Sequence, residues 1–306
     1  MNIAIIGANG FIGSHLSKVL SKDPRLNLFF FGRSSENNLS SETNYHGINH
    51  LHLQKYTTLF SEIDLVYYLA SSSIPASSWD NPHEEIEINL KPFLDYLDFF
   101  TLCKIKKLVF VSSAGTVYGP SKVKVKEDAD KHPFSPHGIV KLAMENFLEY
   151  HRRKSNLQYD IYRVSNVFGE GQNTKKGLGL INTLLENCIV NRKVTVFGNG
   201  ENLRNYVYVK DLVQLMQHSI KAEIKESSIF NLASNDSYTI NQIIEALKEI
   251  VEEDFEVVYQ PNRKSDNEFI DIDNSKILLS YPDFQFTDFK QAIKNTYDHI
   301  KSVLQT

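Results

Sequence analysis

The chain has 306 residues, of which 42% are hydrophobic and 23% charged, and its formal net charge is −4. Ordinary counts of Gly, Pro and Cys (14, 9 and 2) exclude a collagen-like fibre, a disordered tail and a disulfide-rich scaffold. The acidic balance argues against a nucleic-acid-binding surface, and the scarcity of cysteine is typical of a reducing compartment. A chain of this length can bury a large core, either as one large α/β unit or as two unequal domains.

The N-terminal sequence favours a protein that stays in the cytoplasm. Glycines interrupt the first apolar run after Ile6, and a basic start and a small-residue cleavage site are both missing. No stretch reaches the roughly 18 apolar residues that a transmembrane helix needs. We therefore expect a soluble cytoplasmic protein with neither a membrane nor a nucleic acid as its partner.

Strand and helix patterns alternate through the first two thirds of the chain. In chain order, the pattern predicts a strand at 2–6, a helix at 11–20, strands at 28–31 and 65–70, a helix at 86–103, a strand at 108–112, a helix at 141–153 and a strand at 159–164. The continuous apolar strands are typical of strands that are covered on both faces. This order predicts an α/β fold with a doubly wound parallel sheet.

The pattern changes after Asn166. The predicted elements there are a helix at 180–190, a strand at 194–197, a turn at 198–200, a strand at 229–232, a helix at 240–251, a strand at 256–259 and a helix at 288–303. We expect a smaller, interleaved C-terminal α/β domain. The predicted division is 1–166 plus 204–234 for the first domain and 167–203 plus 235–306 for the second.

A glycine-rich turn follows the first predicted strand, with the spacing G-x-x-G-x-x-G. Gly7 would allow a tight turn, Gly10 would let the backbone approach a pyrophosphate, and Gly13 would let the helix pack on the sheet. The helix N-terminus offers free N–H groups to phosphates. A Rossmann-type dinucleotide site is therefore predicted, although the turn would also serve packing alone. The predicted cofactor contacts in it are Gly7, Asn9, Gly10, Phe11, Ile12 and Gly13.

The end of the second predicted strand reads Gly32-Arg33-Ser34 and has no carboxylate. An acidic residue there would bond the ribose hydroxyls of NAD, whereas an arginine can meet the 2′-phosphate of NADP with a planar, charged fork. The sequence thus favours NADP(H). NAD stays possible if Arg33 only stacks on the adenine.

Two further segments add to the glycine turn as motifs: SSAGTVYG at 112–119 and SPHGIVK at 135–141. With the glycine turn they resemble the extended short-chain dehydrogenase/reductases that modify nucleotide sugars. The resemblance covers nearly the whole chain, and its other matches are Leu69-Ala70 with Pro75, Asn89, SNVFG at 165–169, RNYVYV from Arg204, and Arg263 with Asp266. It implies that Leu69, Ala70, Asn89, Ser112 and Lys141 also contact the cofactor. It further implies a homodimer that pairs through the helices at 86–103 and 141–153.

The catalytic pattern departs from that family, whose chemistry depends on Ser/Thr, Tyr and Lys. The Tyr-x-x-x-Lys spacing puts both side chains on one helix face. This chain keeps Lys141 but has His137 at the Tyr position and Ala114 at the usual Ser/Thr position. The cation of Lys141 is expected to favour a neutral imidazole at His137.

Three interpretations of this departure stay open. His137 acts as the acid/base in place of Tyr, while Ser113 or Thr116 orients the substrate oxygen. Alternatively, the protein binds cofactor and nucleotide sugar with little chemistry, or the sequence is an engineered variant whose Tyr has been replaced.

On the substrate side, the resemblance places Asn166, Arg204 and Arg263 at a nucleotide diphosphate. Asn205 stands where the family usually has Asp. Ser73, in a polar loop after a predicted strand, would contact the sugar or simply form a turn. The ten histidines do not cluster at ligand spacing, so no metal site is predicted.

The predicted function is that of a UDP-hexose 4-epimerase-like enzyme with a nucleotide-diphosphate sugar as substrate. An NADPH-dependent reductase of nucleotide 4-keto-sugars is the alternative within the same family. A catalytically weak protein that binds nucleotide sugar and cofactor is the alternative of another class.

Overall fold

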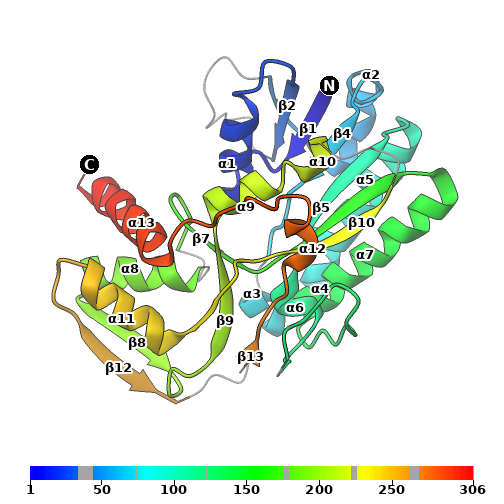
Figure 1. The fold of residues 1–306 in the computed structure, drawn as a ribbon. Coiled ribbons are helices and arrows are strands. Elements are labelled where there is room, and N and C mark those ends of the chain that lie inside the picture. The colour runs from blue at the N-terminus through cyan, green and yellow to red at the C-terminus, as the bar shows by residue number, and fades with distance from the viewer. Residues whose placement is uncertain are drawn as a thin grey trace. The chain divides into compact units, whose positions relative to one another are not determined.

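The computed structural model describes residues 1–33, 44–73, 75–121, 123–174, 179–221, 226–261 and 269–305. The chain forms two compact units, drawn as one ribbon in Figure 1. Unit 1 comprises Met1–Val117, Pro133–Arg163 and Val213–Phe230; unit 2 comprises Tyr118–His132, Val164–Leu212 and Asn231–Thr306. The assignment of a cofactor and a nucleotide sugar to separate domains stays a prediction.

A seven-stranded sheet with the order β10-β6-β5-β4-β1-β2-β3 is built mainly from unit 1. Its strands are β1 (Asn2–Ile6), β2 (Asn27–Gly32), β3 (Tyr45–Gly47), β4 (Leu65–Tyr68), β5 (Lys107–Ser113), β6 (Gln158–Val164) and β10 (Ser228–Leu232). Parallel pairs join β3, β2, β1, β4 and β5 in turn. All four residues of β4 are buried, which shows that both faces of the sheet are covered. The predicted doubly wound parallel sheet is confirmed.

The helices of unit 1 follow the predicted pattern, with several short additions. They are α1 (Phe11–Leu20), α2 (Thr57–Phe60), α3 (Pro75–Asp80), α4 (Pro82–Glu85), α5 (Lys91–Leu102), α6 (Ala114–Val117), α7 (Pro136–Ser155) and α10 (His218–Lys221), with a 3₁₀ helix, η1, at His50–Tyr56.

The single helix predicted at 86–103 is wrong in its first turn. Residues Ile86–Leu90 form a π-helical turn, η2, and α5 begins only at Lys91. Pro92 explains the change, because it has no N–H to donate and its ring would clash with the carbonyl four residues earlier in a regular α-helix.

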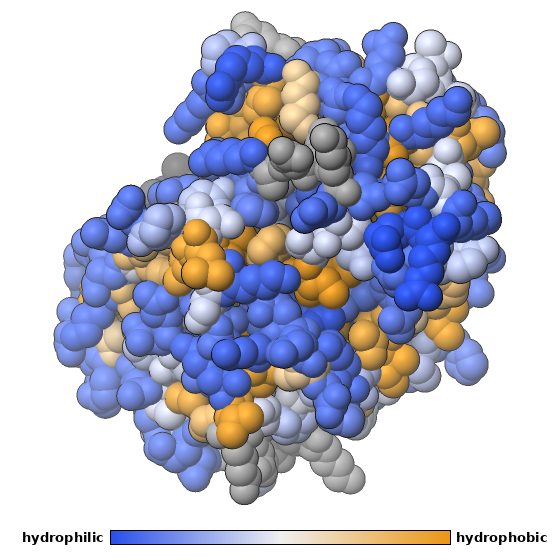
Figure 2. Space-filling model, turned by 45° about the vertical axis from the view of Figure 1, so that its right-hand side comes forward, coloured by the Kyte–Doolittle hydropathy of each residue, from blue (hydrophilic) through white to orange (hydrophobic). Residues whose placement is uncertain are grey.

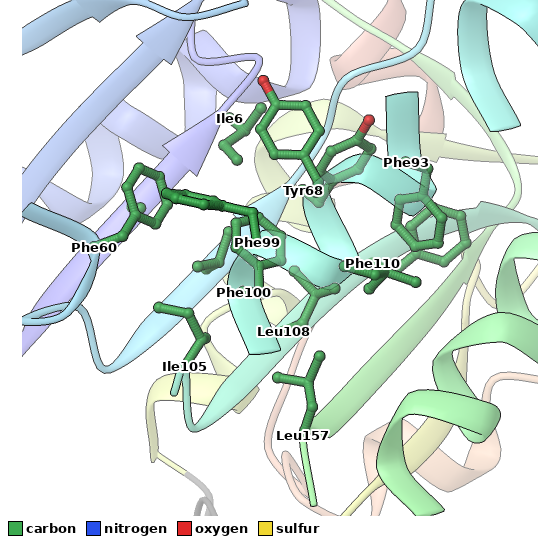
Figure 3. Close-up of a cluster of buried hydrophobic side chains, with 14 of the residues drawn as sticks. Ile6, Phe60, Tyr68, Phe93, Phe99, Phe100, Ile105, Leu108, Phe110 and Leu157 are labelled. Carbon is green, nitrogen blue, oxygen red and sulfur yellow. The ribbon is translucent and has the colours of Figure 1, made fainter. Parts of the chain in front are cut away.

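Aromatic side chains fill the space between the sheet and helices α5 and α7, which lie side by side in Figure 1. Phe93 of α5 meets Phe110 of β5 with ring centroids 5.0 Å apart, and Phe60 meets Phe99 at 5.1 Å. Figure 3 shows these rings facing one another in a continuous cluster. Burying one such side chain contributes about 1.5–3 kcal/mol. Helix α7 joins the same cluster through its aliphatic residues Val140, Met144 and Leu148.

Unit 2 contains a four-stranded sheet, in which β9 (Leu203–Tyr208) pairs with β7 (Asn166–Phe168), β11 (Ser237–Thr239) and β13 (Phe269–Ile270). A separate parallel pair joins β8 (Lys193–Phe197) to β12 (Glu256–Gln260). The helices are α8 (Leu180–Val190), α11 (Ile240–Ile250), α12 (Ser275–Leu278) and α13 (Phe289–Leu304), and α9 (Val209–Leu215) begins directly after β9. The predicted helix at 180–190 is confirmed at both ends.

The surface drawn in Figure 2 is mainly hydrophilic, and its hydrophobic residues form separate patches. Within the part of the chain that the structure describes, no helix is long and apolar enough to span a membrane.

Candidate active site

The glycine turn between β1 and α1 has a geometry that fits a dinucleotide. Gly7 has φ +90°, and a Cβ on it would lie 3.0 Å from the amide nitrogen of Ala70, after β4. A Cβ on Gly13 would lie 2.1 Å from the carbonyl oxygen of Gly7, so only glycine lets α1 pack on this turn. No side chain caps the helix at Gly10, which leaves its N-terminal amides for a ligand. The contacts predicted for Gly10, Phe11 and Ile12 stay predictions.

Arg33 lies beyond the end of β2 and donates a hydrogen bond from Nη1 to Ser72 Oγ, 3.2 Å away. Just before it, a Cβ on Gly32 would lie 2.1 Å from the hydroxyl of Tyr45. That hydroxyl also accepts a hydrogen bond from Asn9 Nδ2 at 2.9 Å. Asn9 of the glycine turn and Gly32 at the end of β2 thus lie against the same tyrosine, while the cofactor contacts of Asn9 and Arg33 stay predictions.

The start of α7 is fixed by its own sequence. Ser135 caps the helix by accepting a hydrogen bond from Gly138 N, and Pro136 occupies the first turn. A Cβ on Gly138 would lie 2.4 Å from the carbonyl oxygen of Thr116, so glycine allows α7 to approach α6 closely. This arrangement places His137 and Lys141 one turn apart on the same face of the helix.

His137 is buried and its imidazole contacts a carboxylate. Its Nδ1 lies 3.0 Å from Glu85 Oε1 and 3.2 Å from Ser73 Oγ, and its backbone N–H donates to Ser78 Oγ. The side chain of Glu85 is only 1% exposed. Sequence reasoning missed Glu85, because it is 52 residues from His137 and belongs to no motif.

Asn89 and Ser73 lie in the same network as His137. Asn89 Nδ2 donates to Ser73 Oγ at 2.8 Å and to Glu85 Oε1 at 3.1 Å, while its Oδ1 accepts from Ser72 N at 2.9 Å. The sequence assigned Asn89 to the cofactor and Ser73 to the sugar, and those ligand contacts stay predictions. The structure shows that both side chains support the carboxylate of Glu85.

Lys141 lies beneath this network. Its Nζ donates to the carbonyl oxygen of Val111 at 3.1 Å and lies over the ring of Phe110. Burial lowers the pKa of Lys141 to about 8, against the opposing effect of Glu85 and Glu145. Burial also lowers the pKa of His137, and the positive charge of Lys141 lowers it further. The hydrogen bond to Glu85 acts in the opposite direction but does not cancel the effect of burial. A neutral imidazole beside Lys141 agrees with the expectation from the sequence.

The other predicted side chains of this region lie at the end of β5 and on α6. Ser112 Oγ donates to Glu145 Oε1 at 2.5 Å, so its hydroxyl is held in the interior of unit 1. Ser113 is half-buried, and Thr116 Oγ1 lies 3.5 Å from its carbonyl oxygen. Ala114 is fully buried. The predicted roles of Ser112, Ser113 and Thr116 toward ligands stay predictions, as does that of Leu69.

The residues predicted to meet the nucleotide diphosphate, Asn166, Arg204 and Arg263, belong to unit 2, whereas Ser73 belongs to unit 1. Asn166 on β7 donates from Nδ2 to the carbonyl oxygen of Asn205 at 2.8 Å, and Arg204 is half-buried on β9 opposite Tyr238. Arg263, with Asp266, lies outside the described residues. Their contacts to a nucleotide sugar stay predictions.

The Asn205 amide has a structural explanation. It is fully buried, donates to the carbonyl oxygens of Ser234 and Asp236 at 2.9 Å each, and accepts from Ser234 N. An aspartate there would direct a carboxylate at two carbonyl oxygens, so the departure from the family residue suits this fold.

Among the residues with described positions, no three His, Cys, Asp or Glu side chains form a metal-binding group.

Known proteins resemble this chain over most of its length. The model of the NAD dependent epimerase/dehydratase family matches residues 3–233. The UDP-glucose 4-epimerase of Lactobacillus helveticus is 27% identical, with 90% of this chain and 89% of that protein covered. The dTDP-4-dehydro-6-deoxyglucose reductase of Escherichia coli is 28% identical over 80% of each chain.

A solved structure gives the same result. The UDP-glucose 4-epimerase of Thermotoga maritima, crystallised with UDP-glucose, is 29% identical, covers 99% of this chain and 100% of its own, and has a TM-score of 0.91. These matches confirm the resemblance to the nucleotide-sugar epimerases and dehydratases that the motifs indicated. The chain belongs to the NAD dependent epimerase/dehydratase family.

Proposed function

We propose that the protein is a nicotinamide-dependent 4-epimerase of UDP-hexoses. The observation that carries this proposal is the end-to-end likeness to the UDP-glucose 4-epimerase of Thermotoga maritima. The arrangement of His137 and Lys141 supports it, since it supplies a neutral proton acceptor and a cation at one end of the sheet.

The residues would perform the following chemistry. The glycine turn between β1 and α1 would hold a nicotinamide cofactor. When bound, it would supply the hydride chemistry that oxidises the sugar C4 to a ketone and reduces that ketone again from the opposite face. His137 takes the proton of the C4 hydroxyl through Nε2 and gives it back when the ketone is reduced, so protons balance over one turnover. The Lys141 ammonium favours the anionic form of the sugar oxygen, and Ser113 or Thr116 orients that oxygen.

The activity is tested with purified protein and UDP-glucose. We expect UDP-galactose to form up to an equilibrium mixture, without net consumption of added NADH or NADPH. The reductase alternative, which the Escherichia coli relative supports, instead predicts stoichiometric loss of NADPH with a nucleotide 4-keto-sugar. Binding of cofactor and UDP-sugar without either reaction would support the catalytically weak alternative.

The choice of cofactor depends on Arg33. The family description favours NAD, whereas we predicted NADP(H) from the arginine, so both cofactors must be compared. If Arg33 binds the 2′-phosphate, Arg33→Ala should weaken NADPH binding about tenfold or more, because hydrogen bonds to charged groups contribute about 1.5–3 kcal/mol. NADH binding should not change. Fluorescence titration measures both affinities. The control is Arg25→Ala, which changes an exposed arginine. Equal NADPH affinities before and after Arg33→Ala would show that Arg33 does not bind the 2′-phosphate.

A homodimer through α5 and α7 is also proposed. Ile139, Phe147 and Tyr150 are exposed on α7 at spacings of eight and three, and Leu102 at the end of α5 is 64% exposed. We expect light scattering at micromolar concentration to give twice the chain mass of 35.1 kDa. Phe147→Glu should shift this to one chain mass, and a monomeric parent protein would contradict the proposal. The cytoplasmic location stays a prediction.

A further inference from the structure

We propose that Glu85 is a positioning residue for His137, which holds the imidazole by its Nδ1–H so that Nε2 faces the substrate proton. This inference rests on the proposed function only in the role of His137 as the acid/base. Its structural part, the tautomer of the imidazole and the state of the carboxylate, can be tested without any activity.

The hydrogen-bond geometry assigns the tautomer. Glu85 Oε1 and His137 Nδ1 are 3.0 Å apart. An ionised carboxylate can only accept hydrogen bonds, so the shared proton belongs to Nδ1. In the neutral ring this leaves the lone pair on Nε2. The histidine side chain is 8% exposed. A lone pair on Nε2 is the acceptor that is needed to remove a proton from a hydroxyl group.

The carboxylate is itself held in place and kept ionised. Asn89, one turn beyond Glu85, donates to Oε1, and its own amide is oriented by the backbone N–H of Ser72. Burial opposes ionisation, but hydrogen bonds from His137 and Ser73 outweigh it and hold the pKa of Glu85 below its usual range. The network therefore presents a fixed negative charge to the buried side of the imidazole.

The charges explain why a carboxylate is needed there. When His137 accepts a proton, it becomes a second cation one helical turn from Lys141, in a buried environment. Like charges at this spacing disfavour the protonated form, and an opposite charge within about 4–6 Å favours it. Glu85, contributed by α4, is that opposite charge. Without it, proton acceptance by His137 would create an uncompensated pair of cations.

A purely structural role would favour a different residue. The second oxygen of Glu85, Oε2, is buried and accepts no hydrogen bond from the described residues. A buried carboxylate with one unsatisfied oxygen costs stability, and a neutral side chain of similar size is often tolerated better. The position thus keeps a charge that packing alone does not require, which points to the proton chemistry of His137.

The structural part is tested by NMR of the full-length protein labelled with ¹⁵N-histidine. The variant His137→Gln identifies the resonances of His137 by their loss. We expect the neutral ring to be protonated at Nδ1, and Glu85→Gln to lower the pKa of His137, since the compensating charge is gone. A ring protonated at Nε2, or an unchanged pKa in Glu85→Gln, would overturn the inference whether or not the protein is an epimerase.

Kinetics test the consequence for catalysis. Glu85→Gln should lower kcat about 10- to 100-fold, as loss of a partner that orients a functional histidine typically does, while KM and the thermal midpoint stay the same. The low-pH limb of kcat should shift to lower pH with the pKa of His137. Glu85→Asp, which keeps the charge, should recover part of the rate.

The matched control is Glu87→Gln, which removes an exposed carboxylate two residues away that pairs with Lys91 on the surface. It should leave rate and pH profile unchanged. Equal rates and pH profiles for Glu85→Gln and Glu87→Gln would contradict the inference. If the parent protein does not epimerise UDP-glucose but His137 shows the expected tautomer and pKa change, the proposed function fails and the positioning role stands.

Discussion

Replacing His137 by Gln is expected to lower the rate of epimerisation by about 10²–10⁴-fold, the usual contribution of a positioned acid/base. In the variant, the backbone N–H of residue 137 can still donate to Ser78 Oγ and the glutamine amide can still donate to Glu85 Oε1, but glutamine cannot take up a proton near neutral pH. The measurement is kcat with saturating UDP-glucose and cofactor, with cofactor affinity determined separately. A rate within about threefold of the parent enzyme would exclude His137 as the acid/base.

The pH dependence provides an independent check of the same residue. His137 must be neutral to accept a proton, so kcat should rise as the pH increases through its pKa, which burial places below the usual range. Lys141 must be charged, so kcat should fall as the pH increases beyond its pKa of about 8. In His137→Gln the low-pH limb should disappear while the high-pH limb remains.

The variant His137→Tyr distinguishes an impaired site from an altered one. If His137 had only replaced the family tyrosine, without any adaptation of the surrounding site, tyrosine would restore the usual family pattern and raise turnover. The structure leads us to expect a decrease instead, because the buried carboxylate of Glu85 would lose its Nδ1–H donor and would oppose formation of a tyrosinate. Turnover above the parent rate would show that the environment of His137 has not adapted to the imidazole.

The long, regular elements of the fold could be predicted from the sequence, but several short ones could not. The apolar strand at Leu65–Tyr68 and the helix at Leu180–Val190 are evident because burial imposes their patterns. The π turn at Ile86–Leu90 was missed because it depends on the missing backbone N–H of Pro92, whereas the prediction used only the spacing of apolar residues. The strand at Leu203–Tyr208 was seen only as a motif, since tertiary pairing on both sides defines it.

The candidate site shows the same division. His137 and Lys141 were found because the resemblance marks the Tyr and Lys positions of the family, and their spacing of four residues puts both on one face of a helix. Glu85 was not, because it meets His137 only through the tertiary packing of α4 against α7. The cofactor contact of Ser112 that the resemblance implies stays a prediction, and its hydroxyl donates to Glu145, a contact that no local pattern reveals.

That contact belongs to a buried ion pair between Arg163 and Glu145 in unit 1. Arg163 at the end of β6 donates from Nε and Nη2 to both oxygens of Glu145 on α7, with Nη2 to Oε2 at 2.6 Å, and Ser112 donates to the same carboxylate. Both side chains are 4% exposed or less. The pair thus joins α7, which carries His137 and Lys141, to the strands beneath it.

Arg163→Met is expected to lower the free energy of unfolding by about 3–5 kcal/mol, because it leaves the carboxylate of Glu145 buried without its counter-charge. The double variant Arg163→Met with Glu145→Gln should recover a large part of this loss, since the penalty comes from the unpaired charge rather than from the missing attraction. Urea unfolding followed by circular dichroism measures the change. The control is Arg153→Met, which breaks an exposed pair with Glu149 on the same helix and should cost less than about 1 kcal/mol. If Arg163→Met and Arg153→Met unfold at the same urea concentration, the buried pair contributes no more than a surface pair, and α7 is held on the sheet by the packing of its aliphatic residues Val140, Met144 and Leu148.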